Sequence, residues 1–216
     1  MRPVNLRLGI IDVDGVCLSQ TVGAAGDAVI NGTLSRGGVA YITANTNLIP
    51  SGYEQYFLRI GTAANLSGIN FTIYGFDAQG NTIEEVIVGP NATTADSTEL
   101  YQVVTRVAVD GATVGAFIIG TIGLGETAPI PLDSYISPFQ VTISVEAAVG
   151  DNIDVEFTND NVFDPNQNLT WAAVSGMSNL AAPTVATLVS PVSALRVVTQ
   201  AVVGTVTGSI RQAGLT

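Results

Sequence analysis

Apolar and polar residues alternate along much of the chain with the two-residue period of a β-strand. In residues 139–145 every second residue is apolar, and after a Val-Gly-Asp turn signal the pattern resumes in residues 153–157. Such alternation gives a strand one buried face and one face in water. We therefore expect these two segments to form an antiparallel hairpin.

A second hairpin is predicted around residues 77–81, whose sequence Asp-Ala-Gln-Gly-Asn is rich in turn formers. Residues 69–76 before it are β-branched and aromatic, and residues 82–88 return as the partner strand. Tyr74 and Phe76 put aromatic rings on the face opposite to the other apolar residues of the first strand. We expect both faces of this strand to be covered, as inside a sandwich.

Further strands are expected where similar segments alternate with turn signals, in residues 39–44, 55–62, 101–109, 115–123, 194–200 and 204–212. No segment has a capped helical stripe, and Pro183 interrupts the best candidate, residues 178–188. Many short strands at regular spacing are typical of all-β folds. The pattern predicts an all-β protein, an antiparallel β-sandwich or jelly roll with one or two β subdomains.

Residues 124–138 contain three prolines and little alternation, which is typical of an extended connector. The predicted organisation is an N-terminal β-sandwich region over residues 1–125, with an extended N-terminal segment, a connector over 126–138 and a C-terminal β region over 139–216. The alternative is one continuous domain in which the proline-containing stretch is a long interstrand loop. Whether the segment through Leu34 folds locally or reaches to a neighbour stays open.

The chain is strongly acidic, with 18 Asp and Glu against 7 basic residues, all arginine, and a formal net charge of −11. Such a surface repels phosphate backbones, which argues against nucleic acid as a partner. No apolar run approaches the roughly 20 residues that cross a bilayer, and the N-terminus lacks the apolar segment of a signal peptide. We therefore expect no membrane partner and folding in the cytoplasm. Cys17 is the only cysteine, so no intrachain disulfide is expected.

The sequence Asp12-Val13-Asp14-Gly15 follows an apolar run and resembles the nucleophile loop of haloacid-dehalogenase-like phosphotransferases. That family also needs a lysine and a parallel sheet with crossover helices, but the chain has no lysine, and residues 22–26 are poor helix formers. Histidine is absent too, which excludes Ser-His-Asp and Cys-His systems. We interpret the motif as a turn and expect no catalytic residues and no enzymatic activity.

An acidic stretch in residues 150–168 offers carboxylates that could bind calcium, namely Asp151, Asp154, Glu156, Asp160 and Asp164. Asp154 and Glu156 alternate with apolar residues, so they fall on the solvated face of a strand, while Asp160 and Asp164 lie in turn-like sequence. The preferred interpretation is a solvated face followed by turns. We expect no metal site and no cofactor.

Trp171 is the only tryptophan, and its side chain could stack on a sugar ring or lie in the core. A single tryptophan among apolar neighbours is more often buried, so a core position is expected. Arg196 and Arg211 lie on predicted strands, where each could pair with acidic neighbours or with a partner subunit. Exposed pairs of that kind contribute little to stability.

Five segments, taken in order, form a recognisable string: residues 14–43, 64–91, 101–115, 159–174 and 191–214. This string resembles β-rich virion structural proteins of tailed bacteriophages, particularly those of podovirus-like particles. The resemblance implies a virion component that decorates or cements the outer capsid surface, folded in the host cytoplasm, with the major capsid protein and copies of itself as partners. A tail, collar or adaptor component of the same particle is one alternative, and a glycan-binding β-sandwich module is another.

Overall fold

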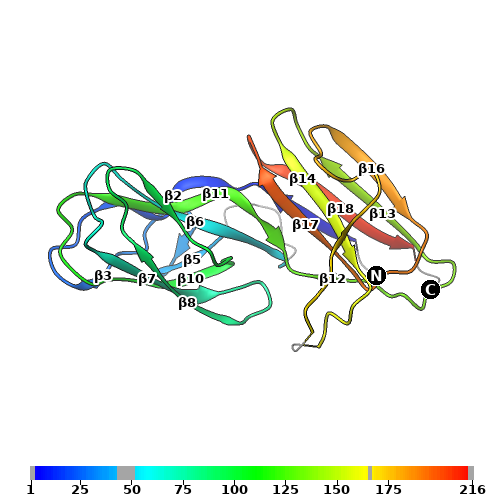
Figure 1. Cartoon of the computed structure of the whole chain (residues 1–216), viewed down its shortest axis with the longest axis horizontal. Helices are drawn as coiled ribbons and strands as arrows, with labels where there is room; N and C mark the ends of the chain where they lie inside the picture. The colour runs from blue at the N-terminus through cyan, green and yellow to red at the C-terminus, as the bar shows by residue number, and fades with distance from the viewer. Residues whose placement is uncertain (1–2, 43–51, 165–166, 214–216) are drawn as a thin grey trace. The chain divides into compact units, whose positions relative to one another are not determined.

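The computed structural model describes residues 3–42, 52–164 and 167–213, and within these ranges the chain forms antiparallel β-sheets and no helix. The predicted all-β class is therefore confirmed, and each part of the chain has the character of a β-sandwich. The chain divides into two compact units (Figure 1). Unit 1 comprises Met1–Gly9 and Leu124–Thr216, and unit 2 comprises Ile10–Gly123. The jelly-roll strand order stays a prediction.

Within the described residues, unit 2 contains nine strands and the first part of a long tenth one. These are β2 (Ile11–Gln20), β3 (Gly26–Asp27), β4 (Ser35–Arg36), β5 (Val39–Tyr41), β6 (Glu54–Thr62), β7 (Asn70–Phe76), β8 (Thr82–Val88), β9 (Thr94–Asp96), β10 (Val103–Val109) and β11 (Phe117–Thr127). One layer has the order β4-β5-β10-β7-β8, with β3 beside β10, and the other layer joins β2, β11, β6 and β9. The predicted segment 39–44 begins as β5, and its residues 43 and 44 lie outside the described ranges.

The core of unit 2 lies between these two layers, where alternate residues of each strand are buried. Phe71 of β7 meets Phe117 of β11 edge to face, with 4.9 Å between ring centroids and 75° between ring planes. The predicted β7–β8 hairpin is confirmed, with an unbroken register from Asn70↔Val88 to Phe76↔Thr82. Its turn is held by Asp77, whose carboxylate accepts the backbone N–H groups of Gln79 and Asn81, each at 2.8 Å.

The described part of unit 1 contains eight further strands and the last residues of β11. These strands are β1 (Val4–Leu8), β12 (Ile130–Pro131), β13 (Gln140–Glu146), β14 (Asn152–Thr158), β15 (Ala172–Ala173), β16 (Pro183–Leu188), β17 (Ala194–Ala201) and β18 (Val206–Ala213). One sheet has the order β1-β18-β13-β16, and β14 lies between β15 and β17 in the other layer. Alternate residues again form the buried face, as with Ile143 of β13 and with Ile153 and Val155 of β14.

The predicted hairpin between residues 139–145 and 153–157 is wrong. Both segments are strands, but β13 pairs with β16 and β18, whereas β14 pairs with β15 and β17. The connection at residues 147–151 therefore crosses from one sheet to the other. Alternation reports that a strand has one buried face, and it carries no information on which strand forms the hydrogen bonds at its edges.

The predicted end of the N-terminal region at residue 125 lies close to the division between Gly123 and Leu124, but the N-terminal strand and the connector are placed differently. The N-terminal strand β1 pairs with β18 over five residues, from Val4↔Ile210 to Leu8↔Val206, so it belongs with the C-terminal part of the chain. The predicted connector contains the end of β11 and the short strand β12, which pairs with β17 through Ile130↔Leu195. Proline is tolerated there because β12 pairs over only two residues at an irregular edge.

Candidate functional site

The Asp12–Gly15 motif lies inside strand β2, so its interpretation as a turn is wrong. The strand is irregular at this point: Cys17 pairs with Ile119 and Asp12 with Thr121, so residues 13–16 face the single residue Gly120. Glycines allow the backbones to approach closely here. A Cβ on Gly120 would lie 1.9 Å from the Asp12 carbonyl oxygen, and one on Gly32 would lie 2.2 Å from the Gly15 carbonyl oxygen.

The Asp12 side chain is engaged by this local structure. Its carboxylate accepts a hydrogen bond from the Thr33 hydroxyl, and its backbone N–H donates to the Thr121 hydroxyl at 3.2 Å. Leu34 and Gly32 donate backbone hydrogen bonds to Gly15 and Val16. The motif is thus the place where residues 32–34 dock on an irregular strand, and no helix follows it in the described chain.

The acidic stretch is spread over separate contacts. Asp151 is buried, and its carboxylate accepts the backbone N–H groups of Ala148 at 2.7 Å and Val203 at 2.9 Å. Asp154 accepts the backbone N–H of Asn179 at 2.7 Å, and Asp160 accepts that of Thr170 at 2.6 Å. Within the described ranges, no three acidic or cysteine side chains gather in a way that could hold a metal ion.

Asp154 and Glu156 lie on the half-exposed face of β14, as the alternation predicts. Asp151 differs, because it is buried and joins the connection after β13 to the connection after β17. Asp151 follows Gly150, and a Gly-Asp pair is typical of a tight connection between strands. This sequence pattern is compatible with a structural role for Asp151 in the connection. The sequence offered no signal for its second partner, Val203, far along the chain.

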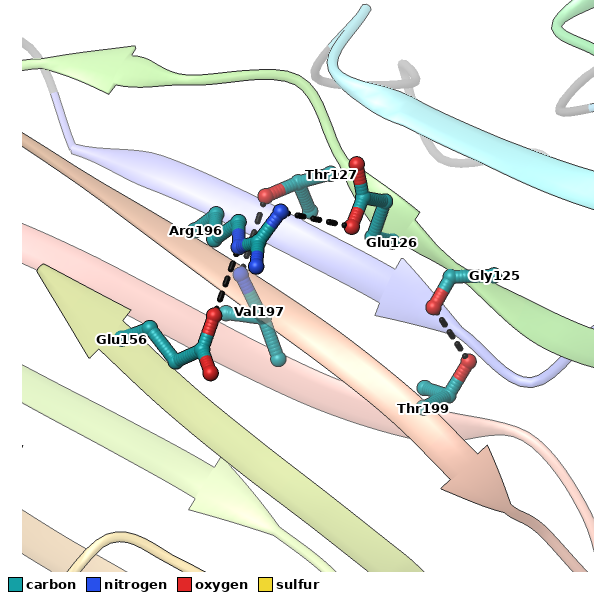
Figure 2. A network of polar contacts seen from close by, with 7 residues as sticks. All are labelled: Gly125, Glu126, Thr127, Glu156, Arg196, Val197 and Thr199. Atoms are coloured by element: carbon teal, nitrogen blue, oxygen red, sulfur yellow. Dashed lines mark hydrogen bonds and ion pairs between the residues drawn. The ribbon is translucent and has the colours of Figure 1, made fainter. Parts of the chain in front are cut away.

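Arg196 of β17 is the centre of a charged cluster on unit 1 (Figure 2). Its guanidinium donates from Nε to Glu156 at 2.6 Å and from Nη1 to Glu126 at 3.0 Å. One cation therefore lies between carboxylates of β14 and β11, the strands on either side of β17. All three side chains are about one quarter exposed. Partial burial strengthens these ion pairs relative to fully exposed ones, and the guanidinium geometry suits two acceptors at once. The predicted pairing of Arg196 with acidic neighbours is confirmed.

Burial raises the pKa of Glu126 above its ordinary value, and the negative charge of Glu156 acts in the same direction, whereas Arg196 lowers it. Two threonines beside the cluster strengthen the contact between β11 and β17. The Thr127 hydroxyl accepts the Val197 N–H at 3.0 Å, and the Thr199 hydroxyl donates to the Gly125 carbonyl at 3.0 Å (Figure 2). The cluster therefore holds together a place where the β11–β17 backbone ladder is short.

Trp171 lies beside the same cluster and not in the core, contrary to expectation. Its side chain is half-buried, and the Arg196 guanidinium lies over its ring with 4.6 Å to the ring centroid. This cation–π contact uses one face of the indole. Arg211, by contrast, is exposed on β18, opposite Thr142 of β13.

The exposed face of the β7–β8 hairpin and its neighbours carries a group of apolar side chains on unit 2. We call this surface the outer face. The register places four exposed apolar side chains on it: Tyr41 (41% exposed), Phe76 (37%), Val86 (60%) and Val88 (57%). Only the other face of β7, with Phe71, Ile73 and Gly75, is buried. The prediction that both faces of β7 are covered is therefore wrong.

Charged groups lie among these apolar residues on the outer face. Arg106 of β10 lies next to Tyr74 with 5.2 Å from its guanidinium carbon to the ring centroid, and it forms an ion pair with Asp27 at 2.8 Å. Glu84 lies opposite Tyr74 on β8. Exposed aromatic and aliphatic groups interleaved with a few charges are typical of protein interaction surfaces. The aromatic residues on both faces of residues 69–76 were the sequence signal for this surface.

Comparison of the chain with protein-family models, curated proteins and solved structures gives no match. In the described ranges, no helix has the length and hydropathy that crossing a bilayer requires. Any functional proposal must therefore be argued from the sequence, surfaces and contacts of the chain itself.

Proposed function

We propose that the chain is a non-enzymatic structural protein of a tailed-phage particle, which decorates or cements the outer capsid shell through repeated protein–protein contacts. The outer face of unit 2 carries the proposal, because its apolar and aromatic side chains gain free energy when a protein surface covers them. The assignment to a phage particle is supported by the resemblance of the ordered segments to virion proteins.

The partners in this proposal are the major capsid protein and copies of the chain itself. A modest contact repeated by symmetry stabilises a whole shell. The net charge of −11 favours the outside of the particle over a position against packaged DNA, where like charges repel.

Copy number in purified particles tests this location. Quantitative mass spectrometry should find the chain at roughly tens to hundreds of copies in a particle if it decorates the shell, as icosahedral repetition requires. About a dozen copies or fewer would instead indicate a tail, collar or adaptor component, because those positions follow low-order cyclic symmetry. Absence from the particle would contradict the proposal altogether.

A matched pair of variants tests the outer face. Val86→Glu places a charge on the outer face, on strand β8, whereas Val114→Glu places the same charge in a loop of unit 2, where Val114 is 81% exposed. We expect Val86→Glu to reduce binding to purified capsids by at least about tenfold and Val114→Glu to leave it unchanged, with both variants as stable as the original chain. Equal binding by both variants would show that the outer face is not the contact.

A further inference from the structure

The edges of the described sheets differ in how well they are protected against pairing with another chain. Edge strands expose unpaired N–H and C=O groups, and proteins usually blunt them with charges, bulges or short length. Strands β4, β9 and β15 are short edges of two or three residues. The longer edges β1 and β8 carry charges, Arg7 on β1 and Glu84 and Glu85 on β8.

The edge strand β16 lacks these protections. It pairs with β13 over six consecutive residues, from Val141↔Leu188 to Glu146↔Pro183, without a register shift. It contains no charged residue, and Val185 at its middle is 66% exposed. Pro183 interrupts only its first position. The opposite edge of β16 has no strand beside it in the described sheets (Figure 1).

The absence of charged residues around this edge allows a second copy of the acidic chain to approach it. Residues 165–195 contain no Asp, Glu, Lys or Arg, although the whole chain has a formal charge of −11. Two copies of such an acidic chain repel one another over most of their surface, and β16 lets them approach through a neutral segment. On the neighbouring strand β13, the residues opposite Val185 and Thr187 are the uncharged Ser144 and Thr142. Glu146, opposite Pro183, lies at the end of the strand.

The hydrogen bonding of an antiparallel strand pair is compatible with a two-fold axis. When a strand pairs with a copy of itself about such an axis, the outward N–H groups of each copy meet the outward C=O groups of the other. We propose that β16 pairs with β16 of a second copy of this chain, which joins two four-stranded sheets into one continuous sheet. This inference deepens the copy-to-copy contact of the proposed function and rests on that part of it.

The oligomeric state of the isolated full chain tests the pairing. Sedimentation equilibrium at about 100 µM should show dimers, because a contact with a Kd in the micromolar range is populated there. Val185→Glu should shift the chain to monomer, since like charges on directly adjacent strands repel. The control Val149→Glu adds the same charge in the turn after β13, where Val149 is 90% exposed, and should leave the dimer intact. A monomeric original chain, or a dimer unaffected by Val185→Glu, would overturn the proposal.

Cross-linking locates the contact independently of stability. Val185→Cys, Thr187→Cys and an equimolar mixture of the two place thiols on adjacent copies of β16, and the native Cys17 is buried. Mild oxidation should give a disulfide-linked dimer in at least one of these samples, whereas Val149→Cys should stay monomeric on a denaturing gel. Cross-linking no greater than that of Val149→Cys would refute the pairing. Capsid binding is measured separately, so failure of either proposal is recognised on its own.

Discussion

Gly120 of β11 lies directly against the backbone of β2. At this point residues 13–16 of β2 form an irregularity in the strand pairing, within the stretch that carries the Asp-Val-Asp-Gly motif. A Cβ added at Gly120 would meet the Asp12 carbonyl oxygen at 1.9 Å and the Val13 carbonyl carbon at 2.4 Å. Both are backbone atoms, so no side-chain rotation relieves the overlap. We expect Gly120→Ala to lower the free energy of unfolding of unit 2 by about 1–3 kcal/mol, measured by urea denaturation.

Gly68 provides the matched control, because a Cβ added there meets no atom within 4 Å. Gly68→Ala should change the free energy of unfolding by no more than about 0.5 kcal/mol. A loss as large as that of Gly120→Ala would show that the effect comes from replacing any glycine in this unit and not from the close approach of two backbones.

Glu126 gives unit 1 a defined pH dependence. Burial raises its pKa in the folded protein, so the folded chain holds the proton more tightly than the unfolded chain does. Its contribution to stability is therefore fully present below the ordinary carboxyl pKa and is lost as the pH rises through the raised value. We expect the free energy of unfolding of the original chain, minus that of Glu126→Gln, to fall between the ordinary and the raised carboxyl pKa. Above the raised pKa this difference should be constant.

Urea denaturation at a series of pH values, monitored by Trp171 fluorescence, measures this difference. Glu146 lies on the exposed face of β13, and Glu146→Gln serves as a control with an exposed carboxyl. A difference that rises with pH in the same interval would contradict the direction assigned to Glu126.

At the residue scale, the sequence identifies individual candidates but not their long-range neighbours. The absence of lysine is the sequence argument against a phosphotransferase interpretation of Asp12 and Asp14, and the rejection of that interpretation stays a prediction. The position of this motif in a strand depends on Gly120 and Gly32, which are distant in sequence and carry no local signal. Local composition wrongly predicts a core position for Trp171, because composition cannot identify Arg196 as the partner of its ring.

At the element scale, Asp151 joins the β13–β14 connection to the β17–β18 connection. Its two carboxylate oxygens each accept one backbone N–H, from Ala148 and Val203. Asp151→Asn replaces one acceptor by an N–H₂ group and leaves one buried donor without its acceptor. We expect the substitution to lower the free energy of unfolding of unit 1 by about 1–3 kcal/mol, measured by urea denaturation.

Glu146→Gln, at an exposed position of β13, should change the same quantity by no more than about 0.5 kcal/mol. If Asp151→Asn were equally neutral, the two connections would not depend on the shared carboxylate.

Strands are predictable from the sequence where alternation is strong, as in β13 and β14, or where strand-forming residues lie between turn signals, as in β6, β10, β17 and β18. The pairing of β7 with β8 is predicted correctly, because a short turn fixes which strands meet. The prediction fails for β13 and β14, because a connection of similar length can also cross between two sheets. Composition alone places the outer face of β7 in the interior, since exposed apolar contact surfaces and buried faces have the same composition.

At the scale of the whole molecule, the chain has one intrinsic probe in each unit. Trp171 is the only tryptophan and belongs to unit 1, and Cys17 is the only cysteine and belongs to unit 2. Cys17 is buried, and burial raises the pKa of its thiol to about 12, so it should react with a thiol reagent only when unit 2 opens. The two probes therefore report on two different units.

We expect Gly120→Ala to shift the urea midpoint of Cys17 labelling while leaving the midpoint of Trp171 fluorescence unchanged. The physical reason is that each unit buries its own set of apolar side chains. Asp151→Asn should have the opposite pattern. Midpoints that shift together in both variants would show that the two units unfold as one cooperative block.

The all-β class is predictable for the whole chain, because alternation and turn signals recur throughout the sequence. The membership of β1 in unit 1 is not, since it depends on the pairing of β1 with β18 at the two ends of the described chain. No sequence-local property marks two strands that are so far apart as neighbours. The proline-containing stretch suggests a connector, but backbone pairing of β12 with β17 makes it part of unit 1.

The β1–β18 pairing also sets an order of events during synthesis. In the sequence, unit 2 lies between the two segments of unit 1. All strands of unit 2 are therefore synthesised before β18, the strand that pairs with β1. A chain stopped before Val206 would lack the hydrogen-bonding neighbour of β1 and yet contain every residue of unit 2. Nascent chains of increasing length should accordingly acquire a protected Cys17 well before they acquire a folded unit 1.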